Sequence, residues 1–304
     1  MNVKKLCEDV LKIRLVEEKI IEVYDKDIIQ CPVHLSIGEE SIPVAICHWL
    51  TNKDKIVGTH RSHALYFALG GDYSSFFCEL LGKKTGCSKG FGGSMHLTNL
   101  NIGLYGTSSI VGGILPIAVG LGLSCDDKEI AVAFFGDGAT DQGVFYESLN
   151  FASLKNIPVL FVCENNRYSI YTPIEERKVV LPHKVAETLK IKSLYCPIEI
   201  SNNVVELAKK VKDIVNYVRN KRKPAFIECE TVRYLDHHGT GCDIERGCRP
   251  VKEKELFEKY DPIKWCKKYL NEFENLREKL KKEIDSAFEQ AIKEENFDLW
   301  KIGK

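Results

Sequence analysis

Two apolar segments joined by an amphipathic one constrain the fold more than any other feature of this sequence. Residues 129–138 read EIAVAFFGDG, and residues 157–169 read IPVLFVCENNRYS. The segment between them, TDQGVFYESLNFASLKN, has the apolar spacing of an amphipathic helix. Strands that are apolar on both sides are typical of a parallel sheet covered by helices on both faces. The three segments therefore predict a right-handed βαβ unit.

The rest of the chain extends this alternation of helices and strands. Apolar spacing predicts a helix over residues 1–24, a strand over 55–61, a helix over 204–221 and a strand over 224–234. Ser36 and Glu39 have the spacing of a capping box before a helix that ends near Leu50. The chain from residue 252 onward is rich in Lys and Glu and is predicted to be helical.

These elements predict the α/β class, with a parallel sheet and helices on both of its faces. We expect residues 1–304 to form a single domain with a helical C-terminal extension over about 252–304. The glycine-rich segment 86–113 has no regular periodicity. It is either a flexible linker or a loop whose backbone approaches a ligand, and its low charge favours the ligand loop.

Composition excludes several classes of function. The 304 residues include 43 basic and 43 acidic side chains, so the chain has no overall basic field for nucleic acid or an anionic membrane. The longest apolar stretch, 110–123, is short and interrupted by glycines, and the N-terminus has no secretory pattern. We therefore expect a soluble, cytoplasmic protein, in which the twelve cysteines are reduced thiols used as small apolar side chains.

Polar residues follow both strands of the βαβ unit, at the carboxyl ends where parallel α/β sheets bind ligands. Asp137 follows the first strand and Asn166 the second, so both lie at the carboxyl edge of the sheet. Carboxylate and amide oxygens are suited to Mg²⁺. A helix beginning near Thr140 would direct its free N–H groups to the same place, and Gly136 and Gly138 allow close approach of the backbone. These residues predict a magnesium-bound diphosphate.

The motifs resemble those of one family. GDG, a helix and then NN after a second strand form the signature of thiamine-diphosphate enzymes. GDGATDQGVFYESLNFA, CENNRYS, HLSIGEE, THRSHALYFALGGD and LLGKKTGCSKGFGGSMHL resemble the alpha subunit of the decarboxylating component of 2-oxo acid dehydrogenase complexes, of the pyruvate or acetoin dehydrogenase type. The resemblance is strongest over residues 10–175. It implies a thiamine-diphosphate-binding fold and an oxidoreductase that decarboxylates pyruvate or a similar 2-oxo acid.

Site residues are implied where the motifs match. The Asp137 and Asn166 side chains and the Tyr168 carbonyl are implied to bind magnesium. His34 and His237 correspond to the family's active-site histidines. The other residues implied to contact the cofactor are His60, Arg61, Ser109, Val111, Gly138 and Ala139.

Simpler structural roles remain open for several of these residues. His34 could serve only as a helix-entry residue, and Arg61 could pair with a surface carboxylate. Ser109 could be an ordinary turn residue. Either His237 or His238 could face the cofactor.

The resemblance also implies partners. Thiamine diphosphate needs a glutamate beside its pyrimidine ring, and the chain offers no convincing candidate. In the family this glutamate comes from a beta subunit, so we expect an α₂β₂ assembly with the cofactor between subunits. The acyl group would pass to a lipoyl-bearing acyltransferase. We expect neither nucleic acid nor a membrane as a partner.

One loop departs from the family pattern. Asp236 stands where the family has a glycine before the loop histidine, and His238 follows His237. This departure motivates an alternative, in which the chain belongs to a related thiamine enzyme that transfers an acyl or ketol unit in biosynthesis without a lipoyl partner. A third hypothesis, motivated by the missing glutamate, is a non-enzymatic module that binds a diphosphate.

Overall fold

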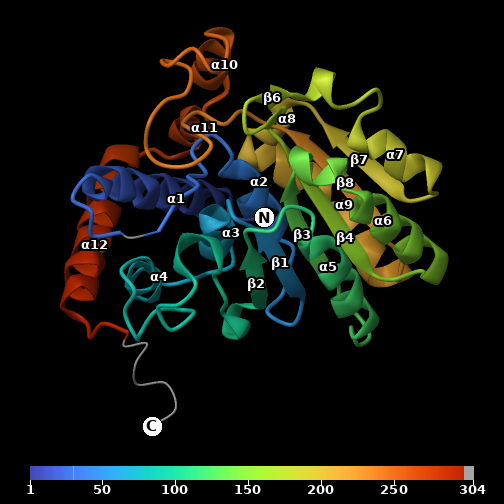
Figure 1. The fold of residues 1–304 in the computed structure, drawn as a ribbon, viewed down its shortest axis with the longest axis horizontal. Coiled ribbons are helices and arrows are strands. Elements are labelled where there is room, and N and C mark those ends of the chain that lie inside the picture. The colour runs from blue at the N-terminus through green and yellow to red at the C-terminus, as the bar shows by residue number, and fades with distance from the viewer. Residues whose placement is uncertain (30, 298–304) are drawn as a thin grey trace.

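The centre of the fold is a six-stranded sheet whose strands are all parallel (Figure 1). The computed structural model describes residues 1–29 and 31–297. The strand order is β2-β1-β3-β4-β8-β7, which confirms the predicted α/β class. The strands are β1 (Lys55–Thr59), β2 (Leu104–Ser108), β3 (Ala131–Gly136), β4 (Val159–Asn165), β7 (Lys192–Cys196) and β8 (Ala225–Glu230), and a separate hairpin pairs β5 (Tyr168–Ser169) with β6 (Thr172–Pro173).

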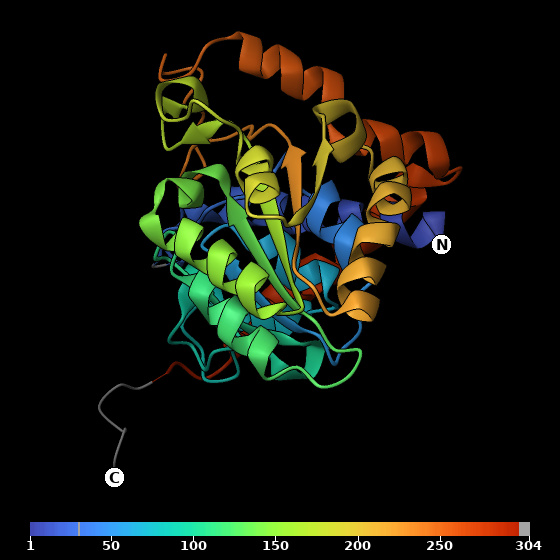
Figure 2. The same ribbon diagram turned by 90° about the vertical axis from the view of Figure 1, so that its right-hand side faces the viewer.

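Helices cover both faces of the sheet. Alternate residues of the central strands point to opposite sides and join two separate apolar clusters. Figure 2 shows α5 and α6 on one side of the sheet and α9 on the other. The first face is covered by α5 (Ile114–Leu123), α6 (Gly143–Lys155) and α7 (Pro182–Thr188), and the second by α2 (Ser41–Cys47), α3 (His63–Ala68) and α9 (Val204–Lys221).

The C-terminal helices pack against the N-terminal part of the chain. Helix α1 (Val3–Tyr24) contacts α11 (Pro262–Tyr269) and α12 (Phe273–Lys293), and α12 also packs on α4 (Tyr73–Leu80). Pro262 begins α11 and separates it from α10 (Lys252–Tyr260). The expected helical extension is therefore present up to residue 293, and its part beyond residue 297 lies outside the described residues. The remaining helical turns are α8 (Ile198–Ser201) and short 3₁₀ turns at Gly93–Met95, Leu100–Ile102, Asp137–Asp141 and Ile174–Glu176.

Two predicted helix starts are wrong. Helix α2 begins at Ser41 without a side-chain cap, and the Glu39 carboxylate instead accepts a hydrogen bond from Asn166. The capping box therefore does not form, because a distant amide competes for Glu39. Helix α6 begins at Gly143, not near Thr140, since the Asp137–Asp141 segment forms a 3₁₀ turn first.

The glycine-rich segment 86–113 is more ordered than its sequence indicates. Its second half contains β2, the edge strand of the sheet, which pairs with β1. Its first half wraps around the buried carboxylate of Glu79, which accepts hydrogen bonds from four backbone N–H groups. A side chain within the core therefore fixes a segment that lacks periodicity of its own.

Two further expectations can be compared with the structure. All twelve cysteines lie in the described residues, and each is a free thiol. Across residues 1–29 and 31–297, every helix is too short or too polar to cross a bilayer.

Candidate active site

A small cavity lies where the strand order of the sheet reverses. The chain passes from β1 to the edge strand β2 and then returns to the other side of β1 to form β3. Such a switch point is where open α/β sheets bind ligands, beyond the carboxyl ends of the strands. The cavity has a volume of about 150 Å³ and is lined by residues that follow β1, β3 and β4.

Asp137 and Asn166 meet at this cavity. The register of β3 and β4 pairs Gly136 with Glu164, so the segments that follow these two strands leave the sheet side by side. Both side chains line the cavity, and both are buried. Burial raises the pKa of Asp137 to about 6, against the opposing effect of Arg177. The structure thus places a carboxylate and an amide at one point, and their role as metal ligands stays a prediction.

Hydrogen bonds fix the orientation of the two asparagines. The Asn165 Oδ1 atom accepts from the Arg167 N–H at 2.9 Å, and the Asn166 Oδ1 atom accepts from the Tyr168 N–H at 3.1 Å. The Asn166 amide nitrogen donates to Glu39 at 2.8 Å. Because Glu39 accepts from the nitrogen, the oxygen of Asn166 faces the turn that carries Tyr168.

Asp137 belongs to a cluster of two carboxylates and two cations. Arg177 donates to Asp137 and, at 2.5 Å, to Asp141. Lys178 also lies 2.5 Å from Asp141. The Asp137 side chain is 1% exposed, so a positive group balances a carboxylate that is removed from water.

Three histidines from distant parts of the chain converge on the same cavity. The ring centroids of His34 and His60 are 4.5 Å apart, and His237 lies 5.1 Å from His34 and 5.4 Å from His60. Backbone pairing brings the late loop to the early one, since the Gly239 N–H donates to the Val33 carbonyl at 2.8 Å. His60 and His237 line the cavity, and His34 lies behind them.

The histidines are neutral at physiological pH. Burial, assisted by the positive charge of Arg61, lowers the pKa of His34 to about 2, of His237 to about 3 and of His60 to about 4. The Nδ1 atom of His34 is buried without a hydrogen-bond partner. On this side of the cavity the imidazoles are uncharged, and the Arg61 guanidinium lies 3.7 Å from the Glu39 carboxylate.

The other predicted cofactor residues fall in different places. Val111, Gly138 and Ala139 line the cavity, whereas Ser109 does not belong to its lining. The Arg61 guanidinium also lines it but donates to the carbonyls of Leu35 and His237, at 2.6 and 2.9 Å. Contact of Arg61 or Ser109 with a cofactor therefore stays a prediction.

Ser169 occupies the space that a side chain at position 138 would need. A Cβ atom at this position would lie 2.9 Å from the Ser169 hydroxyl. A side chain at this position would crowd Ser169, and close approach of the Gly138 backbone to a ligand stays a prediction.

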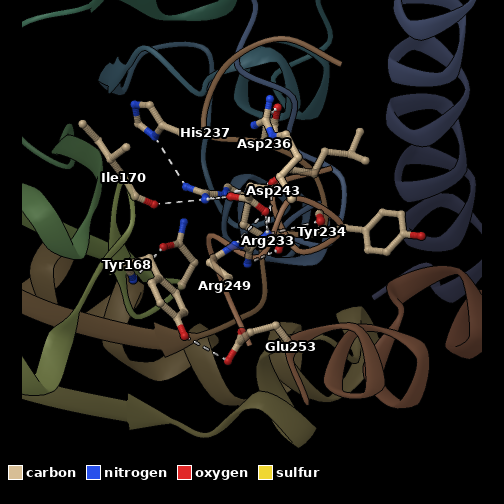
Figure 3. Close-up of polar contacts among 12 residues, drawn as sticks. Tyr168, Ile170, Arg233, Tyr234, Asp236, His237, Asp243, Arg249 and Glu253 are labelled. Carbon is tan, nitrogen blue, oxygen red and sulfur yellow. Dashed lines mark hydrogen bonds and ion pairs between the residues drawn. The ribbon is translucent and has the colours of Figure 1, made fainter. Parts of the chain in front are cut away.

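A buried charge network holds the loop that carries His237 (Figure 3). Asp243 accepts hydrogen bonds from Arg233 at 2.6 Å and from Arg249 at 2.6 and 2.9 Å, and all three side chains are almost fully buried. Arg233 also approaches the ring of His237. The unusual residue Asp236 pairs with Arg246 at 2.5 Å. These contacts close the loop over one side of the cavity.

Four residues of the site were missed in the sequence. Glu39 was assigned to a helix cap, although it lies in HLSIGEE, a motif of the family. Glu164 lies near the end of β4, and nothing local marks it as a cavity residue. Arg177 has no sequence signal because its partner Asp137 is distant in the chain, and Arg233 has none because its partner Asp243 lies across an irregular loop.

An acidic turn and an amide turn that lie together at a switch point define an α/β protein that binds a polar ligand, typically a phosphate group, at the carboxyl edge of its sheet. Comparison with known proteins identifies the family. Residues 8–298 match the model described as dehydrogenase E1 component, and the chain belongs to this family. The cofactor that the family implies is thiamine diphosphate.

Characterised relatives have matching length. The alpha subunit of the acetoin:2,6-dichlorophenolindophenol oxidoreductase of Bacillus subtilis is 33% identical over 295 residues, which cover 93% of this chain and 86% of the relative. The pyruvate dehydrogenase E1 component subunit alpha of Rickettsia bellii is 33% identical over 294 residues, which cover 95% and 88%. The resemblance to alpha subunits of the pyruvate and acetoin dehydrogenase type is therefore confirmed.

Proposed function

We propose that this chain is the alpha subunit of a thiamine-diphosphate-dependent 2-oxo acid dehydrogenase. The reaction is the oxidative decarboxylation of pyruvate or a similar 2-oxo acid, with transfer of the acyl group to a lipoyl acceptor. Family membership and the names of the relatives support the class of enzyme. The single observation that carries the site is the meeting of Asp137 and Asn166 at the switch point of the sheet.

The residues at this point fit a magnesium-bound diphosphate. Asp137 and Asn166 offer hard oxygen ligands, and the Tyr168 carbonyl follows two residues after Asn166. Gly138 and Ala139 bring backbone to the cavity without a bulky side chain. Glu39 orients the Asn166 amide by accepting from its nitrogen, which leaves the oxygen for a cation.

The bound cofactor supplies a carbanion that adds to the 2-oxo group. This chain contributes the surroundings of that reaction. His60 and His237, which line the cavity, are neutral, so their N–H groups can donate hydrogen bonds to a substrate oxygen, and His34 packs against both rings. Arg61 and Arg233 place two positive charges at the cavity, which attract the carboxylate of a 2-oxo acid.

The proposal includes a beta subunit. The cavity within this chain has about 150 Å³, which is less than the ~300–1,000 Å³ of ordinary ligand pockets, and we propose that the beta subunit supplies further walls. The two glutamates of the cavity have other roles. Glu39 binds Asn166, and burial and the neighbouring Glu39 raise the pKa of Glu164 well above its usual range. We therefore propose that the pyrimidine-side glutamate comes from the partner, in an α₂β₂ assembly of this single-domain chain.

The test uses the complex of this chain with its beta subunit. We expect pyruvate or another 2-oxo acid to reduce an artificial electron acceptor in a magnesium- and thiamine-diphosphate-dependent assay. Asp137→Asn should weaken magnesium-dependent cofactor binding by more than about 100-fold, since it removes the charged ligand. Asp213→Asn, an exposed position on α9, is the control. Unchanged cofactor affinity in Asp137→Asn would refute the metal assignment.

A second candidate function rests on the loop around Asp236. This residue replaces the family's glycine, and its pairing with Arg246 changes the polarity of the acceptor side. A related thiamine enzyme that transfers an acyl or ketol unit without a lipoyl partner would need a different acceptor there. Product formation that requires an aldehyde or sugar acceptor, and no lipoyl protein, would favour this alternative.

A further inference from the structure

A cation of the chain itself binds the carboxylate that is proposed to hold magnesium. The Nη2 atom of Arg177 donates to Oδ2 of Asp137, and its Nη1 atom donates to Asp141 at 2.5 Å. Its Nε atom donates to the Thr172 carbonyl at 3.2 Å. The Arg177 side chain is 11% exposed, so this is a largely buried pair and not a solvent contact.

Arginine and a divalent ion compete for the single negative charge of this carboxylate. Mg²⁺ binds carboxylate oxygen at about 2.0–2.1 Å in a nearly ideal octahedron. A guanidinium that donates to the same carboxylate lies a few ångströms from the ion, where two positive charges repel strongly in a buried site. Metal binding therefore favours a shift of the guanidinium away from Asp137.

We propose that Arg177 is an internal cation that occupies the metal side of Asp137 in the cofactor-free protein and yields that position to magnesium. This inference rests on the proposed function of Asp137. It assigns to Arg177 a role in the affinity and order of metal loading. In the empty site Arg177 neutralises a buried carboxylate, which would otherwise be an unpaired charge.

The displaced side chain has a place to go. When the contact with Asp137 is broken, the Asp141 carboxylate remains as a partner for the guanidinium. The backbone around it is fixed, because the Arg177 and Lys178 N–H groups both donate to the Ile174 carbonyl, at 3.0 and 2.9 Å. Rotation of the side chain toward Asp141, which is 25% exposed, is therefore sufficient, and no loop has to open.

Lys178 provides a matched control. It has the same charge and adjoins Arg177, but it contacts Asp141 and not Asp137. Lys178→Gln removes one positive charge from the same cluster without freeing Asp137. A general electrostatic effect on metal binding should appear equally in Arg177→Gln and Lys178→Gln, whereas displacement should appear only in the first.

The experiment measures Mn²⁺ binding to the complex with the beta subunit after removal of metal and cofactor. Electron paramagnetic resonance reports the free ion, without any assay of activity. Because a competing buried charge pair is removed, we expect Arg177→Gln to bind Mn²⁺ at least about tenfold more tightly than the wild type. Lys178→Gln should change affinity less than about threefold, as expected of a more exposed pair. Arg177→Lys, which keeps the charge, should lie between wild type and Arg177→Gln.

Thermal unfolding provides a second readout. Without metal, Arg177→Gln should melt at a lower temperature than the wild type, and Mg²⁺ should raise its melting temperature by more. If Arg177→Gln is folded and its Mn²⁺ affinity equals that of Lys178→Gln, the pair with Asp137 is only structural and the inference is wrong. If Asp137→Asn binds Mn²⁺ as the wild type does, the proposed function of Asp137 fails instead. The two failures are therefore distinguishable.

Discussion

Glu79, on α4, should be the carboxylate on which the order of the glycine-rich segment 86–113 depends most. Its Oε2 atom accepts from the N–H groups of Ser88 and Gly90, at 2.7 and 2.9 Å, and its Oε1 atom accepts from those of Gly92 and Gly93, at 2.6 and 3.1 Å. The side chain is 1% exposed. One carboxylate thus satisfies four backbone donors that have no helix or strand to pair with.

Glu79→Gln keeps the shape of the side chain but replaces one oxygen by an amide nitrogen. Two N–H groups then face a donor, so two of the four hydrogen bonds are lost. At about 1.5–3 kcal/mol for a hydrogen bond to a charged group, the free energy of unfolding should fall by about 3–6 kcal/mol. The melting temperature should fall by roughly 6–12 °C for a chain of this size.

Thermal unfolding and amide hydrogen exchange check this prediction. Exchange at Ser88–Gly93 should accelerate far more than exchange in the central strands. Asp72→Asn, in the cap of the same helix, is the control, because its amide oxygen can still accept from the Ser75 N–H. The reasoning is refuted if Glu79→Gln melts within about 2 °C of this control, or if exchange in the segment is unchanged.

Three further predictions concern the site. Gly138→Ala should weaken cofactor binding by about tenfold, since its Cβ would lie 2.9 Å from the Ser169 hydroxyl, and Ser169→Ala should restore most of it in calorimetry. His34 has a folded pKa of about 2, below its unfolded value, so stability falls by up to about 1.4 kcal/mol per pH unit below pH 6.5. His34→Asn should flatten that slope in urea unfolding between pH 7.5 and 5.5, and an equal slope would contradict the prediction. Asp243→Asn leaves two buried guanidinium groups with a weaker partner, costs about 3–5 kcal/mol and should speed tryptic cleavage at the exposed Arg246 by loosening its loop.

The sequence alone determined the central βαβ unit and the position of its polar turns. Period and turn residues are local signals, so β3, α6 and β4 were predicted from short segments. Because neighbouring parallel strands end at the same edge of a sheet, the sequence predicts that Asp137 and Asn166 lie close together. The register of β3 and β4 places both residues at that edge. Errors remained at element ends, where the 3₁₀ turn before α6 and the short edge strand β2 have weak periodicity.

Only the tertiary structure decided which distant side chains meet these turns. The local sequence around Glu39 fits a helix cap. In the fold, Glu39 instead accepts a hydrogen bond from Asn166, which lies far along the chain. The pairing of Arg177 with Asp137, and the meeting of His34 with His237, depend on how loops pack over the finished sheet. Such contacts follow from shape and charge in three dimensions, for which one sequence carries no periodic signal.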